Sequence, residues 1–251
     1  MRVSRGEMQM KSKLINTGFV LAVLGGILGI IFSAMMIWAD LEANNFEYAQ
    51  TGEKNLRAIR CPILINGDEE SSITVRLKNN RDEVMTPFLR AYVSEEHIAL
   101  TRQSSHNLTL QPGDITEIIW KIYPEDAVYE RFVFFRVYFK DDYPHPSRDG
   151  NCGVWVTDFP GLSGQQLVGL SISATLLLLI GGNILLILNP LPHGNKKKEI
   201  ATGLNYLSAL ILIDLLLGVL GLWVLGLIIL IVILVVSFVL LLRSITQESI
   251  A

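Results

Sequence analysis

Three long apolar stretches dominate the chain, and a region of mixed polarity separates the first from the second. Residues 14–39, 162–188 and 204–242 hold almost no charge, whereas residues 40–160 have the composition of a soluble domain. About 20 apolar residues are enough to cross a membrane as a helix. Each of the first two stretches therefore predicts one membrane-spanning helix.

The third apolar stretch is too long for a single crossing. Its 39 residues would form a helix about 58 Å long, whereas the hydrocarbon core of a bilayer is about 30 Å thick. We expect the chain to turn back near Gly218, Gly221 and Trp223. This predicts two short spans, residues 203–220 and 223–242, and four spans in total.

Basic residues flank these spans on one side only. They are Arg2, Arg5, Lys11 and Lys13 before the first span, Lys196, Lys197 and Lys198 after the second, and Arg243 after the last. The positive-inside rule then predicts cytoplasmic termini in a multi-pass protein of the cell membrane. Residues 40–160, with 13 basic and 20 acidic residues and a net charge of −7, would lie outside. Short juxtamembrane clusters indicate contact with anionic lipids and argue against nucleic-acid binding.

The spans and charges together predict an order of segments along the chain. It is a basic cytoplasmic N-terminus (1–13), a first span (14–39), a spacer (40–60), an extracytoplasmic β-sandwich (61–158), a second span (162–188), a basic cytoplasmic loop (189–202), third and fourth spans (203–220 and 223–242) and a cytoplasmic tail (243–251). The first apolar run is longer than the core of a signal peptide, which favours an uncleaved anchor. A cleaved signal is the alternative.

The only two cysteines, Cys61 and Cys152, both fall in the region expected outside the membrane. An even cysteine count confined to an oxidising compartment predicts one disulfide. Closing a loop of about 90 residues is expected to stabilise the domain by about 4–5 kcal/mol. No histidine or further cysteine stands at the spacing of a metal site, so no metal is expected.

Short strand-like runs alternate with turn signals through the exported region. The runs are 61–66, 72–78, 87–94, 97–102, 106–110, 115–123, 132–140 and 152–157. Seven or eight such strands over about 97 residues are typical of an immunoglobulin-like sandwich. The predicted fold class is therefore an α-helical membrane protein with an all-β sandwich inserted between its first and second helices.

Two sequence segments sharpen this expectation. ITVRLKNNRDE (73–83) ends a strand in a turn, and LTLQPGDITEIIWKI (108–122) passes through a Pro-Gly turn into an alternating strand. Over residues 73–122 this pattern resembles the bacterial immunoglobulin-like modules of the cell-adhesion-related type, called CARDB. The resemblance implies the fold and, at most, a binding or spacing module.

Two strands depart from the usual pattern of apolar residues inside and polar residues outside. Alternation leaves aromatic and arginine side chains on their outer face. With one residue of the last strand, the set is Phe88, Arg90, Tyr92, Phe134, Arg136, Tyr138 and Trp155. These residue types dominate protein-binding hot spots, so we predict a partner-binding face. The alternative is that residues 40–60 or the end of a membrane helix cover it.

Further candidates lie in a loop and in the membrane. The loop 141–151 is a predicted recognition loop through Tyr143, His145 and Arg148, or else a rigid connector. Asp214 is the intramembrane carboxyl, expected near the bilayer midplane, and Thr175 could hydrogen-bond to it. Asp214 is either a functional group or a polar contact between helices.

Small residues on the first span follow a spacing of four. They are Gly18, Ala22 and Gly26, and Gly25, Gly29 and Ser33. This spacing lets helices approach closely, within the chain or with a partner helix.

No catalytic motif, phosphate-binding loop or cofactor motif occurs in the chain, so we expect neither an enzyme nor a cofactor. The function expected is that of an interaction or accessory protein, which binds a membrane or surface protein or serves as a non-catalytic subunit. The alternatives are a small transporter or channel subunit that uses Asp214, and a purely structural envelope protein.

Overall fold

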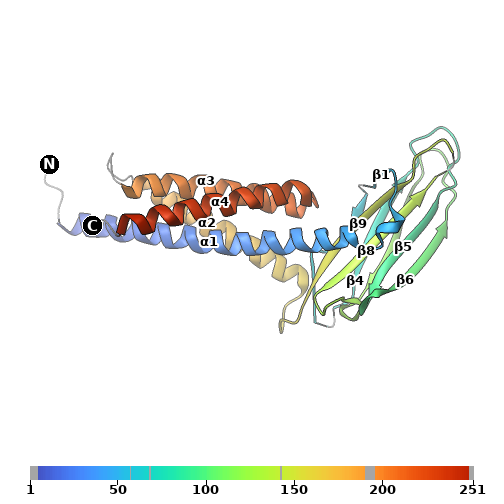
Figure 1. Ribbon diagram of the computed structural model, residues 1–251, viewed down its shortest axis with the longest axis horizontal. Helices are drawn as coiled ribbons and strands as arrows, with labels where there is room; N and C mark the ends of the chain where they lie inside the picture. The colour runs from blue at the N-terminus through green and yellow to red at the C-terminus, as the bar shows by residue number, and fades with distance from the viewer. Residues whose placement is uncertain (1–4, 57, 68, 142, 190–195, 249–251) are drawn as a thin grey trace. The chain divides into compact units, whose positions relative to one another are not determined.

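The computed structural model describes residues 5–56, 58–67, 69–141, 143–189 and 196–248 (Figure 1). The chain divides into two compact units. Residues 1–37 and 169–251 form one, called here the helical unit, and residues 38–168 form the other, called the β unit.

Four helices are long and apolar enough to cross a membrane. They are α1 (Arg5–Asn45), α2 (Gly164–Leu188), α3 (Lys196–Val219) and α4 (Trp223–Glu248), with candidate spans Gln9–Asn45, Gly164–Leu188, Lys198–Val219 and Trp223–Arg243. Large apolar side chains are exposed along all four, as expected where lipid replaces water. The 41 residues of α1 make about 61 Å of helix, so one crossing uses only about half of it.

A tight turn divides the apolar stretch 204–242 into α3 and α4. Gly221 adopts a left-handed conformation with φ of 67°. The N–H of Leu222 donates to the carbonyl of Leu217, which closes the end of α3. Glycine is favoured at this position because it carries no Cβ.

Glycines bring the helices of this unit into close contact. A Cβ added at Gly25 would lie 2.8 Å from the Cβ of Leu178 on α2. One added at Gly18 would lie 3.1 Å from the carbonyl oxygen of Gly182, also on α2. Gly18 and Gly25, two of the small residues that the sequence singled out on α1, thus stand at helix contacts within the chain, where larger side chains would not fit.

The β unit contains nine strands among its described residues. They are β1 (Lys54–Asn55), β2 (Ile59–Arg60), β3 (Leu64–Asn66), β4 (Ser71–Lys78), β5 (Phe88–Glu95), β6 (His97–Asn107), β7 (Ile115–Ile122), β8 (Phe132–Lys140) and β9 (Arg148–Thr157). Two short 3-10 helices, η1 (Tyr48–Gln50) and η2 (Pro124–Asp126), connect them.

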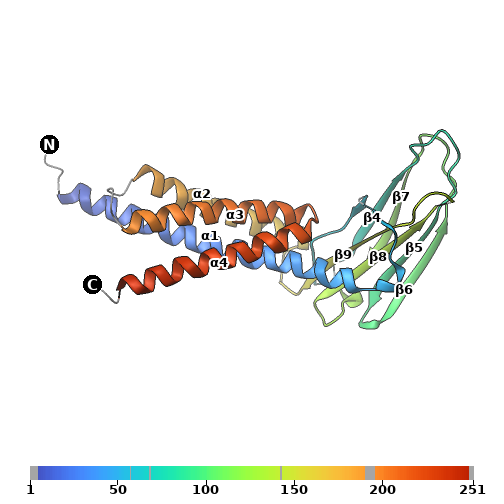
Figure 2. The same ribbon diagram turned by 45° about the horizontal axis from the view of Figure 1, so that its top comes forward.

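The strands form two sheets (Figure 2). The larger has the order β1-β9-β8-β5-β6, with β3 also paired to β9. Strands β1 and β3 run parallel to β9, and β8 runs antiparallel to β9 and to β5. The smaller sheet has the order β2-β4-β7 and is antiparallel.

The predicted fold class is wrong. An all-β immunoglobulin-like sandwich between the first and second helices is not what the chain forms, because the larger sheet is mixed and helices lie at both ends of the chain. The β unit also begins inside a helix, since residues from Trp38 to Asn45 of α1 belong to it. The polar spacer expected at 40–60 is therefore helical in its first six residues.

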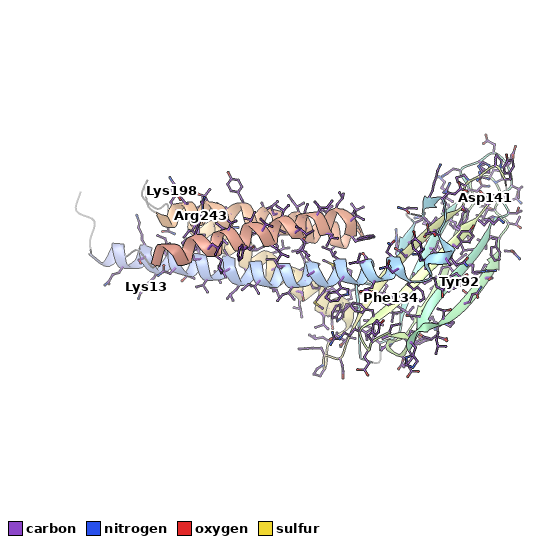
Figure 3. The ribbon with its side chains drawn as sticks, in the orientation of Figure 1. Lys13, Tyr92, Phe134, Asp141, Lys198 and Arg243 are labelled. Atoms are coloured by element: carbon purple, nitrogen blue, oxygen red, sulfur yellow. A yellow bond between two sulfur atoms is a disulfide. The ribbon has the colours of Figure 1, made fainter. Side chains whose placement is uncertain are left out.

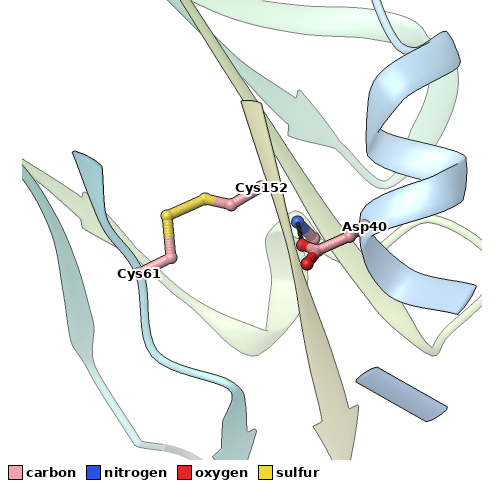
Figure 4. The surroundings of a disulfide bond; sticks show 4 residues. Asp40, Cys61 and Cys152 are labelled. Atoms are coloured by element: carbon pink, nitrogen blue, oxygen red, sulfur yellow. Dashed lines mark hydrogen bonds between the residues drawn. A yellow bond between two sulfur atoms is a disulfide. The ribbon is translucent and has the colours of Figure 1, made fainter. Parts of the chain in front are cut away.

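Apolar side chains from both sheets share one core. Ile73, Val75 and Trp120 of the smaller sheet pack with Leu89 and Phe135 of the larger. The predicted disulfide is confirmed: Cys61 and Cys152 are bonded, with their Cα atoms 6.5 Å apart (Figure 4). Cys61 follows β2 and Cys152 lies within β9, so the bond joins segments 91 residues apart in the chain.

Candidate binding surface

The end of α1 covers part of the outer face of the larger sheet. Ala39, Ala43 and Phe46 form a buried cluster with side chains of the sheet that include Tyr92 and Phe134 (Figure 3). The rings of Phe46 and Phe134 lie 5.8 Å apart. Ala39 and Ala43 of α1, and Phe46 directly after its last residue, recur at intervals of four and three, so they form one apolar stripe that faces the sheet.

The helix approaches strand β9 most closely at Gly153. A Cβ added there would overlap the carbonyl group of Ala39, so this position requires glycine. The N–H of Gly153 donates to Oδ1 of Asp40 over 3.2 Å (Figure 4). Asp40 follows the apolar run of α1. Burial raises the pKa of this carboxyl from 3.8 to about 6, and the hydrogen bond from Gly153 opposes that shift.

Arg136 of β8 binds the last turn of α1. Its side chain is fully buried, with Nη1 2.9 Å from Oδ2 of Asp149 and Nη2 donating to the carbonyl of Asn44 over 2.6 Å. A cation at the carboxyl end of a helix satisfies free carbonyls and complements the helix dipole. Burial lowers the pKa of the Arg136 guanidinium, and the charge of Asp149 counteracts this.

The partner-binding face predicted from the sequence is therefore closed over much of its area. Tyr92, Phe134 and Arg136 are 5%, 1% and 0% exposed, so the expectation that they face solvent is wrong. Trp155 is partly buried and meets the edge of Phe132, with ring centroids 4.8 Å apart. The alternative reading, a cover supplied by residues 40–60 or a helix end, matches the structure, because α1 continues past Ala39.

The rest of that face remains open and forms a cavity of about 420 Å³. Its lining comprises Gln50, Thr86, Phe88, Arg90, Tyr138, Lys140 and Asp141. Four of these side chains come from two neighbouring strands, where Phe88 stands opposite Lys140 and Arg90 opposite Tyr138. Side chains at such paired positions lie next to each other on the sheet surface. We call this cavity the outer pocket.

The outer pocket is positively charged. The guanidinium carbon of Arg90 lies 5.1 Å from the centre of the Phe88 ring, an arrangement that favours the cation. Among the ion pairs of the described residues, none includes Arg90 or Lys140. Asp141, the acidic residue among the described residues of the lining, forms an ion pair with Arg81 that neutralises its charge. Two cations thus face the cavity in a domain whose net charge is negative.

Sequence reasoning placed Phe88, Arg90 and Tyr138 on this surface but did not select Lys140. The alternation of β8 carries the signal, because Lys140 shares the outer face with Arg136 and Tyr138. Gln50 and Thr86 had no such signal. They reach the pocket through the path of the chain after α1 and the segment before β5, which no periodic pattern predicts.

The predicted recognition loop lies between β8 and β9. Tyr143 is 98% exposed and His145 is exposed, whereas Arg148 is the first residue of β9, with its guanidinium 6.0 Å from the ring of Phe139. The structure does not bring Tyr143 or His145 into the outer pocket lining. Their part in recognition stays a prediction.

Asp214 is fully buried in the helical unit. Neither oxygen of its carboxyl group has a hydrogen-bond partner among the described residues. Thr175 does not supply one, because its hydroxyl donates to the carbonyl of Ser171 over 2.8 Å. Gly226 of α4 lies next to this carboxyl, since a Cβ added there would lie 3.4 Å from Oδ1 of Asp214.

In the described part of the chain, no group of three or more His, Cys, Asp and Glu residues could hold a metal ion.

No family model and no curated protein matches the chain. Solved structures that resemble it include a CARDB domain from Pyrococcus furiosus in complex with di-metal ions, with a TM-score of 0.32 and 12% identity over 39% of this chain and 83% of that one. Red sea bream transglutaminase gives a TM-score of 0.33 and 12% identity over 39% of this chain and 16% of its own. A superoxide reductase from Ignicoccus hospitalis gives a TM-score of 0.30 and 12% identity over 42% of this chain and 80% of its own.

A CARDB domain, the module that residues 73–122 resemble in sequence, is thus among the similar structures. The chain spans about a sixth of the transglutaminase. At TM-scores near 0.3, these similarities indicate nothing about activity.

Proposed function

We propose that this chain is a membrane-anchored binding protein, an accessory and non-catalytic component that holds a partner protein through its β unit. The observation that carries the proposal is the outer pocket. Its aromatic and cationic side chains are of the types that dominate binding hot spots. These side chains remain open, whereas the end of α1 covers the other part of the same face.

The proposal includes a topology with cytoplasmic termini and with residues 40–160 outside the cell. The charge distribution supports it: Lys13, Lys198 and Arg243 lie at the same end of the helical unit (Figure 3). The disulfide supports an exported β unit, because such bonds persist in oxidising compartments. Reporter fusions after Ile200 and at the C-terminus should both report the cytoplasm. An exterior C-terminus would contradict this topology.

Co-purification from mild detergent tests the binding function. The native chain should carry a stoichiometric partner, and Tyr138→Ala combined with Arg90→Ala should lose it. Truncating one hot-spot residue costs at least about 2 kcal/mol, so the pair should weaken binding by 10²-fold or more. Tyr129→Ala is the matched control, because Tyr129 is 64% exposed and lies outside the pocket lining. Retention of the partner by the double variant would refute the proposed site.

Asp214 supports a second candidate function, that of a small transporter or channel subunit. Its carboxyl is buried and has no hydrogen-bond partner in the described part of the chain, and such a group is costly within a membrane and often functional. If Asp214 moves ions or protons, Asp214→Asn should abolish that flux in proteoliposomes at unchanged protein abundance. If neither a partner nor a flux is found, the remaining candidate is a structural protein of the cell envelope.

A further inference from the structure

We propose that the outer pocket binds a carboxylate side chain in an acidic segment of the partner protein. This inference rests on the proposed function and specifies the chemistry of the partner. Arg90 and Lys140 would hold the carboxylate, and the ring of Tyr138 would border it.

The sheet register makes these groups converge. Arg90 stands opposite Tyr138, and Lys140 stands opposite Phe88, on adjacent strands whose other faces are buried in the core. Leu89 and Phe139 anchor the two strands from below, with 0% and 3% exposure. The cations therefore sit on a rigid platform, which reduces the conformational entropy lost on binding.

Arg90 is also positioned before any ligand arrives. Its guanidinium lies over the Phe88 ring, and its Nε atom is buried without a hydrogen-bond partner among the described residues. It makes no ion pair with them either, so the terminal nitrogens have unused donor capacity. A guanidinium fork matches the two oxygens of a carboxylate, and the Lys140 ammonium adds a second cation.

Charge complementarity selects the occupant. The described lining contains the cations Arg90 and Lys140 and the anion Asp141, whose charge Arg81 already balances. A cationic or neutral group would therefore gain little electrostatic attraction there. The β unit as a whole repels anions because its acidic residues outnumber its basic ones. An anionic segment can therefore be attracted only where the local charge is positive, which gives the pocket specificity as well as affinity.

The test uses the full-length chain in nanodiscs of phosphatidylcholine, a lipid without net charge. Isothermal titration compares hexaglutamate with hexaglutamine, which has the same length and no charge. Hexaglutamate should bind and hexaglutamine should not. Arg90→Gln and Lys140→Gln should each weaken hexaglutamate at least tenfold. Arg131→Gln is the matched control, because this exposed arginine near the start of β8 carries the same charge away from the pocket.

The titrations distinguish a carboxylate site in the outer pocket from the alternatives. Absence of hexaglutamate binding, equal binding of both peptides, or an equal loss in Arg131→Gln would overturn the inference. Inorganic phosphate is the second probe: if it binds as tightly with the same dependence on Arg90, the pocket takes free oxyanions rather than a peptide. Loss of partner co-purification in the Tyr138 and Arg90 variant, combined with no hexaglutamate binding, would leave the proposed function standing and remove only this inference.

Discussion

Replacing Asp40 by asparagine should stabilise the β unit at neutral pH. The carboxyl is partly buried where α1 meets β9, and its pKa is raised from 3.8 to about 6. Because this pKa is about 2 higher in the folded protein, the charged carboxyl is disfavoured there by about 3 kcal/mol, at 1.36 kcal/mol per pKa unit. Asparagine carries no charge and keeps an oxygen for the N–H of Gly153. Because the site is partly exposed, we expect a gain of about 1–3 kcal/mol.

The pH dependence follows from the direction of the shift. Between pH 3.8 and 6 the folded β unit binds a proton at Asp40 that the unfolded chain has released, so stability falls as pH rises through this window. The free-energy cost of the charged Asp40 carboxyl in the folded protein is complete above pH 6 and absent below pH 3.8. The difference in unfolding free energy between Asp40→Asn and the native chain should therefore grow from near zero at pH 3.5 to its full value at pH 7.

Urea unfolding of the β unit in mild detergent, followed by tryptophan fluorescence, measures this difference with the disulfide intact. Other titrating groups are common to both proteins and cancel in the comparison. Glu125→Gln is the control, because this exposed residue should change stability by less than about 0.5 kcal/mol. Equal stability of the Asp40→Asn and native proteins at pH 7, or a difference independent of pH, would refute the argument that Asp40 is buried at this contact.

Four further changes test the same structure. Gly153→Ala should destabilise the β unit by about 1–3 kcal/mol and expose residues 39–46 to hydrogen exchange, whereas Gly169→Ala, which meets open space, should have little effect. Arg136→Met should cost about 3–5 kcal/mol in urea unfolding by leaving Asp149 buried and unpaired, and Arg136→Met with Asp149→Leu should recover much of it. Replacing Cys61 and Cys152 by serine should cost about 4–5 kcal/mol, and peptide mapping without reductant should find the native pair linked. Asp214→Leu should raise the thermal stability of the helical unit if the carboxyl only contacts helices, and a drop in stability would argue for a specific polar contact.

The sequence predicted the features that depend on local composition. Four apolar helices follow from hydropathy, and the disulfide follows from two cysteines in one exported region. The inward faces of β5 and β8 follow from strict alternation, since Leu89, Val93, Val133 and Val137 are all buried as expected. Hydropathy and alternation are read from residues close together in the sequence, and the disulfide is read from the number of cysteines.

The features that the sequence did not predict depend on pairing between distant segments. Strands β1 and β3 have two and three residues and pair in parallel with β9, so no alternation marks them. The sequence left open whether residues 40–60 or a helix end cover the sheet, because Asp40, Glu42 and Asn44 make the segment look like a polar spacer. Only the stripe of Ala39, Ala43 and Phe46 shows that one side of this segment is apolar.

The covered and open halves of the outer face carry the same alternating pattern, so the pattern alone cannot separate packing from binding. Tyr92 and Phe134 are covered by Ala39, Ala43 and Phe46, whereas Phe88 and Tyr138 lie beyond the point where the helix ends at Asn45. The arginines divide in the same way. Arg136 has a carboxylate and a helix carbonyl as partners, and Arg90 has an aromatic ring beneath it and no described ion-pair partner. An arginine whose charge is satisfied within the fold stabilises the fold, and one whose charge is not satisfied is available to a ligand. The length of α1 therefore determines which part of this face can bind a partner.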